Sequence, residues 1–126
     1  MNEKKVASIT AMGGPDRYDY FVRKVADFEL LYGLFDDGWA MMESDDETRC
    51  FPFWPESEFA ELLATERWKN YRPKEIELAT FLGRWIPGMT KDGLSVAVFP
   101  TPTGPGVVVK PDRLAGDLAE ECSQYE

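Results

Sequence analysis

Residues 30–54 read LLYGLFDDGWAMMESDDETRCFPFW, and this stretch decides the fold. Its first six residues are aliphatic or aromatic apart from Gly33, a composition typical of a pleated strand. Asp37-Gly38 is a hairpin signal, because both central residues of a type I′ turn need positive φ. Two further runs, 39–43 and 48–53, flank the polar residues 44–47. The stretch therefore predicts a three-stranded antiparallel meander.

Pro52 sets a limit on the last of these strands. Proline has no N–H to donate to a strand ladder, so the strand should lie at a sheet edge or stop pairing early. An exposed edge from Arg49 to Phe53 would also allow self-association, since unpaired edges can pair with a second chain.

Helical spacing recurs on both sides of the meander. Pro15 and Asp16 are start signals, and the apolar residues that follow at steps of three and four predict a helix packed on the meander. A short helix is expected from about Glu3 to Met12 and another after Pro55, whereas Pro87-Gly88 should stop or bend a third. The inward residues expected are Tyr18, Phe21, Val22, Val25 and Phe28, then Phe59, Leu62 and Leu63, then Leu78, Phe81, Leu82 and Trp85, and finally Leu114, Leu118, Cys122 and Tyr125 of a helix opened by Pro111.

Two strands are expected in the second half. Leu94–Phe99 is apolar on both faces, which places it centrally in a covered sheet. Val107–Val109 returns as its hairpin partner, and Pro73 makes 65–77 an ordered connecting loop. Together these elements predict an α+β fold. Residues 1–126 are expected to form a single domain in which an antiparallel sheet of about five strands packs with three to five helices. Residues 1–14 are expected to form a helix that could attach loosely.

Composition excludes several function classes. The chain has 126 residues and a formal net charge of −9, which argues against nucleic-acid phosphate and anionic membranes as partners. It has no histidine and two cysteines, so His-based catalysis and thiolate zinc sites are excluded. No apolar run is long enough to cross a bilayer. We expect a cytoplasmic protein, a monomer or homodimer, with no cofactor, no metal site and no catalytic residue that sequence can name.

The segment 67–74 is the most unusual local composition. It carries Arg67, Lys69, Arg72 and Lys74 with no acid between them, and Trp68 and Tyr71 are interleaved. Basic and aromatic side chains together suit a phosphate, a carboxylate or an acidic peptide. The alternative is a structural loop whose aromatic residues anchor to the core while its cations pair with the protein's own acids.

Acidic residues gather in the two turns of the meander. Between 36 and 47 the chain has six acids and no Lys or Arg, namely Asp36, Asp37, Glu43, Asp45, Asp46 and Glu47. Their spacing does not match a calcium loop, which needs ligands at alternate positions, so solvated turn residues are expected. The Pro-Thr-Pro-Thr-Gly-Pro-Gly loop at 100–106 could be a recognition finger or a plain hairpin connection. Trp39, Trp54 and Trp85 could line a groove, although aromatics of this size are usually core.

Several motifs together carry a family resemblance. Arg17-Tyr18, DDGWA at 36–40, Phe53-Trp54-Pro55, WKNYRPKEIEL at 68–78 and VFPTP at 98–102 resemble a bacterial family catalogued as domain of unknown function 2750. The resemblance runs from about Arg17 to the C-terminus. It implies a small soluble bacterial protein and carries over no reaction or catalytic residue.

Two functions of different classes remain open. The acidic charge and the missing nucleophile motifs favour a non-catalytic protein-binding module, of an inhibitor or immunity type, whose acidic face covers a basic protein partner. The alternative is a small-ligand binder or enzyme with an anion-binding site around 68–72, where Trp68, Lys69, Tyr71 and Arg72 would meet Asp36 and Asp37.

Overall fold

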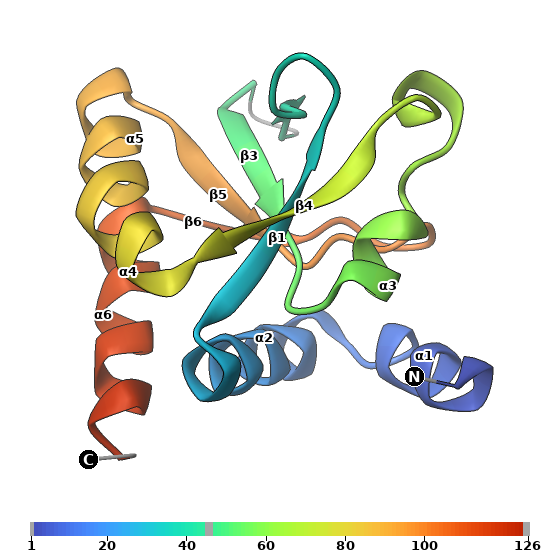
Figure 1. The fold of residues 1–126 in the computed structure, drawn as a ribbon, viewed down its shortest axis with the longest axis horizontal. Coiled ribbons are helices and arrows are strands. Elements are labelled where there is room, and N and C mark those ends of the chain that lie inside the picture. Colours follow the sequence, from blue (N-terminus) through green and yellow to red (C-terminus); the bar gives the residue numbers. More distant parts are fainter. Residues whose placement is uncertain (1, 45–46, 125–126) are drawn as a thin grey trace.

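The computed structural model describes residues 2–44 and 47–124, and these residues form an α+β fold, as the sequence predicts (Figure 1). Within these residues the helices are α1 (Glu3–Thr10), α2 (Gly14–Phe28), α3 (Ser57–Glu61), α4 (Leu78–Thr80), α5 (Ile86–Asp92) and α6 (Pro111–Ser123), with a 3₁₀ turn, η1 (Glu66–Trp68), and a π-helical turn, η2 (Phe81–Trp85). The strands are β1 (Leu30–Phe35), β2 (Met42–Glu43), β3 (Arg49–Phe53), β4 (Arg72–Glu77), β5 (Ser95–Val98) and β6 (Val107–Val109). Asp45, Asp46 and Tyr125, which the sequence assigns to a turn and to the last helix, lie outside the described residues.

The second hairpin of the predicted meander is confirmed, since β2 pairs antiparallel with β3. The first hairpin is wrong, because β1 pairs with β4 and not with the strand that follows it. Their antiparallel register runs from Leu30 opposite Glu77 to Phe35 opposite Arg72. Two isolated bridges connect β1 to the later part of residues 30–54, one from Phe35 to Trp39 and one from Tyr32 to Trp54. Residues 72–77 are therefore a strand and not the connecting loop that Pro73 indicated. In the described residues β4 is bonded on one side alone, which is where a strand tolerates a proline.

The reversal after β1 occurs where Asp37-Gly38 predicts it, but its geometry differs from a type I′ turn. Asp37 has a positive φ of 58°, and Gly38 does not. Asp36 N–H donates to the Gly38 carbonyl, and Ala40 N–H donates to the Leu34 carbonyl. The chain then leaves β1 because Trp39 folds back over Gly33, where a Cβ would lie 2.9 Å from the indole ring.

The second sheet has the order β2-β3-β5-β6 and is mixed, not purely antiparallel. β3 and β5 are parallel, with Phe53 opposite Val98, whereas β6 pairs antiparallel with β5 as the sequence predicts. β5 is central and buried at all four residues, again as predicted. β3 lies between β2 and β5, so it is not an edge strand, but the alternative that it stops pairing early is confirmed on its β2 side. Pro52 is accommodated because β2 pairs with β3 at Arg49 and Cys50 alone.

Pro87 does not end the helix that contains it. The chain stays helical from α4 through η2 into α5, and it ends at Gly93 in the left-handed conformation. The five residues before Ile86 form the π-helical turn. A π turn shifts the backbone hydrogen-bond pattern by one residue, which accommodates the N–H that Pro87 lacks.

The core forms where the two sheets cross above α2 (Figure 1). Tyr18, Phe21, Val22 and Val25 of α2 are buried, as the helical spacing predicts. Phe28 and Leu62 are exceptions, with exposed fractions of 55% and 37%. Phe28 is the last residue of α2 and packs beside Lys24, and Leu62 caps a helix of one turn. Near the N-terminus, Ile9 of α1 is buried. None of the helices in the described residues is long and apolar enough to span a bilayer.

Two buried side chains fix the loop that joins β5 to β6, which reaches across the molecule towards α3 (Figure 1). Trp54 Nε1 donates to the Pro100 carbonyl at 2.8 Å. Arg17 donates to the carbonyls of Phe99, Met12 and Pro105 at 3.1, 2.6 and 3.0 Å. Burial lowers the pKa of Arg17 from its ordinary value. The loop is thus held by the core as well as by the pairing of Thr101 with Gly104 within it.

Gly33 is where a single methyl group should disturb the fold. Gly33→Ala would place a Cβ 2.9 Å from the Trp39 ring, and that ring cannot move freely because it packs against Trp85 with centroids 4.9 Å apart. We expect a loss of about 1–3 kcal/mol in the free energy of unfolding, measured by denaturant titration. Gly38→Ala is the matched control, because no atom lies within 4 Å of its Cβ position. Equal stability of the two variants would contradict this packing.

Candidate functional site

The predicted basic segment divides into buried and exposed parts. Trp68 is buried in η1, with the guanidinium of Arg67 4.8 Å from its ring centre. Lys69 is exposed, and Arg72 Nη1 donates to the carbonyls of Lys69 and Tyr71 at 3.2 and 2.8 Å. Within residues 2–44 and 47–124, the cations of this segment form no ion pair with a carboxylate. The alternative of a loop neutralised by the protein's own acids therefore finds no support in the described residues.

The two turn acids lie at the same end of the β1–β4 pair as Arg72. Phe35 is opposite Arg72, so the next residues, Asp36 and Asp37, begin the turn beside it. Lys74 comes close to the same end, with its ammonium 4.1 Å from the centre of the Phe35 ring. The structure thus brings Asp36, Asp37 and Arg72 to one end of the sheet, while Trp68 is buried in the turn that precedes β4.

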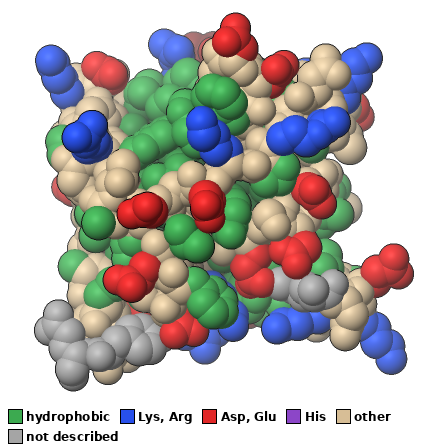
Figure 2. Space-filling view, in the orientation of Figure 1, with side chains coloured by type: hydrophobic (Ala, Val, Ile, Leu, Met, Phe, Trp, Pro, Cys, Tyr) green, Lys and Arg blue, Asp and Glu red, His purple; other side chains and the backbone are tan. Residues whose placement is uncertain are grey.

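The three tryptophans that could line a groove have different surroundings. Trp54 has no exposed surface. Trp39 and Trp85 are half-buried and belong to a cluster of edge-to-face rings with Phe35, Phe51 and Phe53. On the face of the molecule drawn in Figure 2, hydrophobic side chains gather in the upper part, over the strands and beside α5, with Lys and Arg side chains around them. This cluster joins the two sheets.

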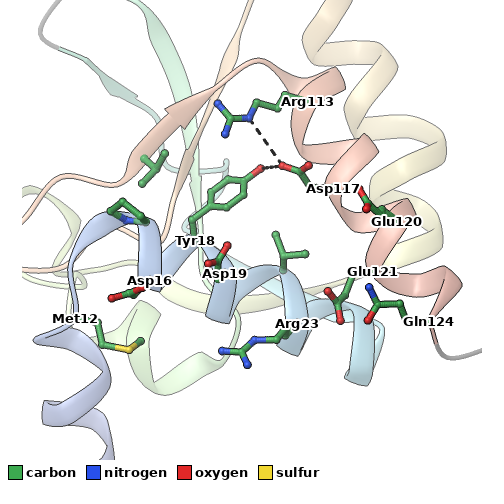
Figure 3. Close-up of a pocket in the computed structure, with 13 residues that line it drawn as sticks. Met12, Asp16, Tyr18, Asp19, Arg23, Arg113, Asp117, Glu120, Glu121 and Gln124 are labelled. Carbon is green, nitrogen blue, oxygen red and sulfur yellow. Dashed lines mark hydrogen bonds and ion pairs between the residues drawn. The ribbon is translucent and has the colours of Figure 1, made fainter.

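A pocket of about 810 Å³ lies elsewhere, between α2 and α6 (Figure 3). Helical spacing places its polar residues: Asp16, Asp19 and Arg23 recur on α2 at steps of three and four, and Arg113 and Asp117 are one turn apart on α6. The remaining lining residues are Glu120, Glu121 and Gln124 of α6 and the less polar Met12, Pro15, Tyr18, Val22 and Val107.

Tyr18 connects the two helices at the centre of this pocket. Its hydroxyl donates to Asp117 Oδ2 at 2.5 Å, and Arg113 Nε lies 3.9 Å from the same oxygen (Figure 3). The Arg113 guanidinium is also 5.7 Å from the centre of the Tyr18 ring. Burial, together with the hydrogen bond to Asp117 and its negative charge, raises the pKa of Tyr18 well above its ordinary value. Tyr18 is therefore a neutral donor that holds Asp117.

The pocket is electrostatically negative. Its lining has five carboxylates, at Asp16, Asp19, Asp117, Glu120 and Glu121, against two arginines, which leaves a formal charge of −3. Its lining also includes the apolar Met12, Val22 and Val107. Such a surface suits a cation on an aliphatic stem, because the stem can lie on apolar atoms while its charge meets carboxylates. Among the described residues, no group of three or more acids or cysteines is arranged to hold a metal ion.

Tyr18 should make the protein sensitive to alkali. Its folded pKa is raised above the ordinary 10.0, so the folded state holds a proton that the unfolded chain releases, and stability should fall as pH rises above about 10. In Tyr18→Phe the free energy of unfolding should be about 1 kcal/mol lower at neutral pH, because the hydrogen bond to Asp117 is lost. Its stability should then fall less steeply with rising pH. Urea unfolding between neutral pH and about pH 11 measures both effects. The fall should not vanish, because burial and Glu56 raise the pKa of Tyr20 as well. An identical pH dependence in Tyr18→Phe and the wild type would contradict this assignment.

The helical spacing predicts Tyr18 in the core but does not join it to the acids of the last helix. The acidic stripes on α2 and α6 are visible in the sequence as separate helical faces. Their meeting is not, because Tyr18 and Asp117 are 99 residues apart.

The fold and the pocket define a class: a small α+β domain with an open acidic pocket between its first long helix and its last. The chain belongs to the family described as Protein of unknown function (DUF2750), whose sequence model matches residues 18–118. This confirms the resemblance drawn from the motifs between Arg17 and the C-terminus. A search of the curated proteins found no match.

Proposed function

We propose that this protein is a non-catalytic binding module that captures a basic segment of a partner protein in the pocket between α2 and α6. The observation that carries the proposal is the lining of that pocket, which combines five carboxylates with apolar side chains. The whole-chain charge of −9 supports it, since a long-range negative field raises the association rate with a basic partner. An inhibitor or immunity-type role is one form of this function.

The pocket offers two kinds of contact to a basic segment. Glu120 is exposed and Glu121 half-buried on α6, so either carboxylate can reach a lysine or arginine. Asp117 is already held by Tyr18 and Arg113, so it stays in place when the ligand arrives. The module therefore binds by charge and shape and needs no covalent step.

A model peptide in which Lys and Leu alternate tests the proposal. Fluorescence anisotropy of the labelled peptide should show saturable binding that weakens with added salt. The variant Glu120→Lys with Glu121→Lys should bind about tenfold more weakly or worse, because it reverses two pocket charges.

The matched control moves the same charges elsewhere. Glu61→Lys with Glu77→Lys changes net charge equally at two exposed residues outside the pocket lining. The control should bind within about twofold of the wild type, because distant exposed charges are screened by salt. If both double variants lose affinity equally, attraction is only global and the pocket is not the site.

A further inference from the structure

A second pocket, of about 460 Å³, lies between η1 and the loop that joins β5 to β6. One wall is Glu66, Arg67 and Trp68, and the other is the chain from Pro100 to Pro105. Met42 and Leu63 complete its apolar lining. This pocket shares no residue with the one between α2 and α6, so it calls for a separate account.

A residue with a strained backbone stands at the start of each wall: Phe99 comes just before Pro100, and Glu66 is the first residue of the other wall. Phe99 has a φ of 58° and Glu66 a φ of 52°, a conformation that non-glycine residues rarely adopt. The other non-glycine residues with positive φ have ordinary causes, since Glu29 caps α2, Asp37 lies in the turn after β1, and Glu47 donates its N–H to Ser44 between β2 and β3. Strain persists where the surroundings impose it, and it concentrates at binding and catalytic sites. Two strained residues therefore flank one pocket.

The wall from Pro100 to Pro105 is held rigid from beneath. Arg17 binds the carbonyls of Phe99 and Pro105, and Trp54 Nε1 binds that of Pro100. Thr101 is buried and pairs with Gly104 in both backbone directions. A wall fixed in advance loses little entropy when a ligand binds, which favours affinity for a small molecule.

Arg67 is the cation of this pocket, and because Glu66 also lines it, an anion must bind on the Arg67 side. Its guanidinium stacks on Trp68, and within the described part of the chain it pairs with no carboxylate. Stacking fixes the plane of a guanidinium while leaving its N–H groups free to donate, and their fork matches a carboxylate or phosphate. The pocket volume falls within the range of small-molecule sites.

We propose that this pocket binds a small organic anion, a carboxylate or phosphate joined to a planar apolar body. The anion pairs with Arg67, and the apolar body lies against Met42, Leu63 and the proline rings. The proposed site differs from the expected anion site around 68–72 in its cation, which is Arg67, since the pocket lining includes neither Lys69 nor Arg72. It is independent of the proposed capture of a basic segment.

Titration with phenyl phosphate, benzoate and inorganic phosphate, followed by amide NMR of the full chain, tests the proposal. Phenyl phosphate or benzoate should cause saturable shifts at the Trp68 indole N–H and at the amides of Thr101 and Gly104. Inorganic phosphate should bind roughly tenfold more weakly, because it lacks the apolar body. Equal binding of inorganic phosphate, no saturable shift, or shifts centred on Tyr18 and Asp117 would each overturn the proposal.

Three variants locate the charge. Arg67→Gln should weaken phenyl phosphate binding roughly tenfold, and Arg67→Lys should fall between it and the wild type because it keeps the charge without the fork. Lys91→Gln, which removes an exposed cation from α5, should bind like the wild type. Wild-type affinity in Arg67→Gln, or an equal loss in Lys91→Gln, would show that Arg67 is not the anion ligand.

Discussion

Replacing Arg17 by methionine is expected to cost about 3–5 kcal/mol in the free energy of unfolding, because three carbonyl oxygens lose their donor at once. The oxygens belong to Phe99, Met12 and Pro105, and the Arg17 side chain has an exposed fraction of 6%. Methionine fills much of the arginine stem but donates no hydrogen bond. The loss is therefore one of hydrogen bonds more than of packing. Denaturant unfolding at neutral pH measures it.

Arg23→Met is the control, since Arg23 lies on the same helix and is exposed. It should change stability by about 0.5 kcal/mol or less. Arg17→Lys should fall between methionine and the wild type, because an ammonium cannot reach three separated carbonyls together. Hydrogen exchange at Thr101, Gly104 and Gly106 should quicken in Arg17→Met. A loss of under about 1 kcal/mol would contradict the view that Arg17 holds the loop.

The helices were predictable because their signals are local. Pro15 and Pro111 mark the first turns of α2 and α6, and the apolar residues behind them recur at helical steps. The apolar residues that are exposed in spite of this spacing include Phe28, the last residue of α2, where the helix extends beyond the core. Pro87 does not stop its helix, because a π-helical turn precedes it, and such a turn leaves no trace in residue type.

The strand pairing was not predictable from local signals. Sequence favours the nearest partner, yet β1 pairs with residues 72–77 and β3 pairs in parallel with β5. Gly33 leaves room for the Trp39 ring on β1, and such a side-chain contact is not visible in local strand signals. The strand of 72–77 then provides β1 with a regular partner.

The candidate site was predictable in parts and not as a whole. The notable basic composition of 67–74 does lead to a pocket, but through Arg67 and Trp68, while Arg72 bonds to its own loop. Whether Lys69, Tyr71 and Arg72 with Asp36 and Asp37 form a binding site stays a prediction. The pocket between α2 and α6 depends on a contact between distant helices, which one sequence does not report.

Trp54→Ala is expected to destabilise the protein by about 3–5 kcal/mol, as large-to-small changes at buried aromatics do. Trp54 has no exposed surface, and its backbone makes the one bridge from Tyr32 to this end of β3 in the described residues. Its indole also binds the Pro100 carbonyl. Removing the ring leaves a cavity where the two sheets and the loop after β5 meet. These three parts cannot all shift to fill that cavity.

Trp54→Phe separates packing from hydrogen bonding. Phenylalanine keeps most of the ring volume and loses the donor to Pro100, so a loss of about 1–2 kcal/mol should come mainly from that carbonyl. Phenyl phosphate binding should weaken in Trp54→Phe while binding of the Lys-Leu peptide stays unchanged, because Trp54 fixes the wall of one pocket and not of the other. If both ligands weaken together, the loop is coupled to the whole fold and is not a separately held wall.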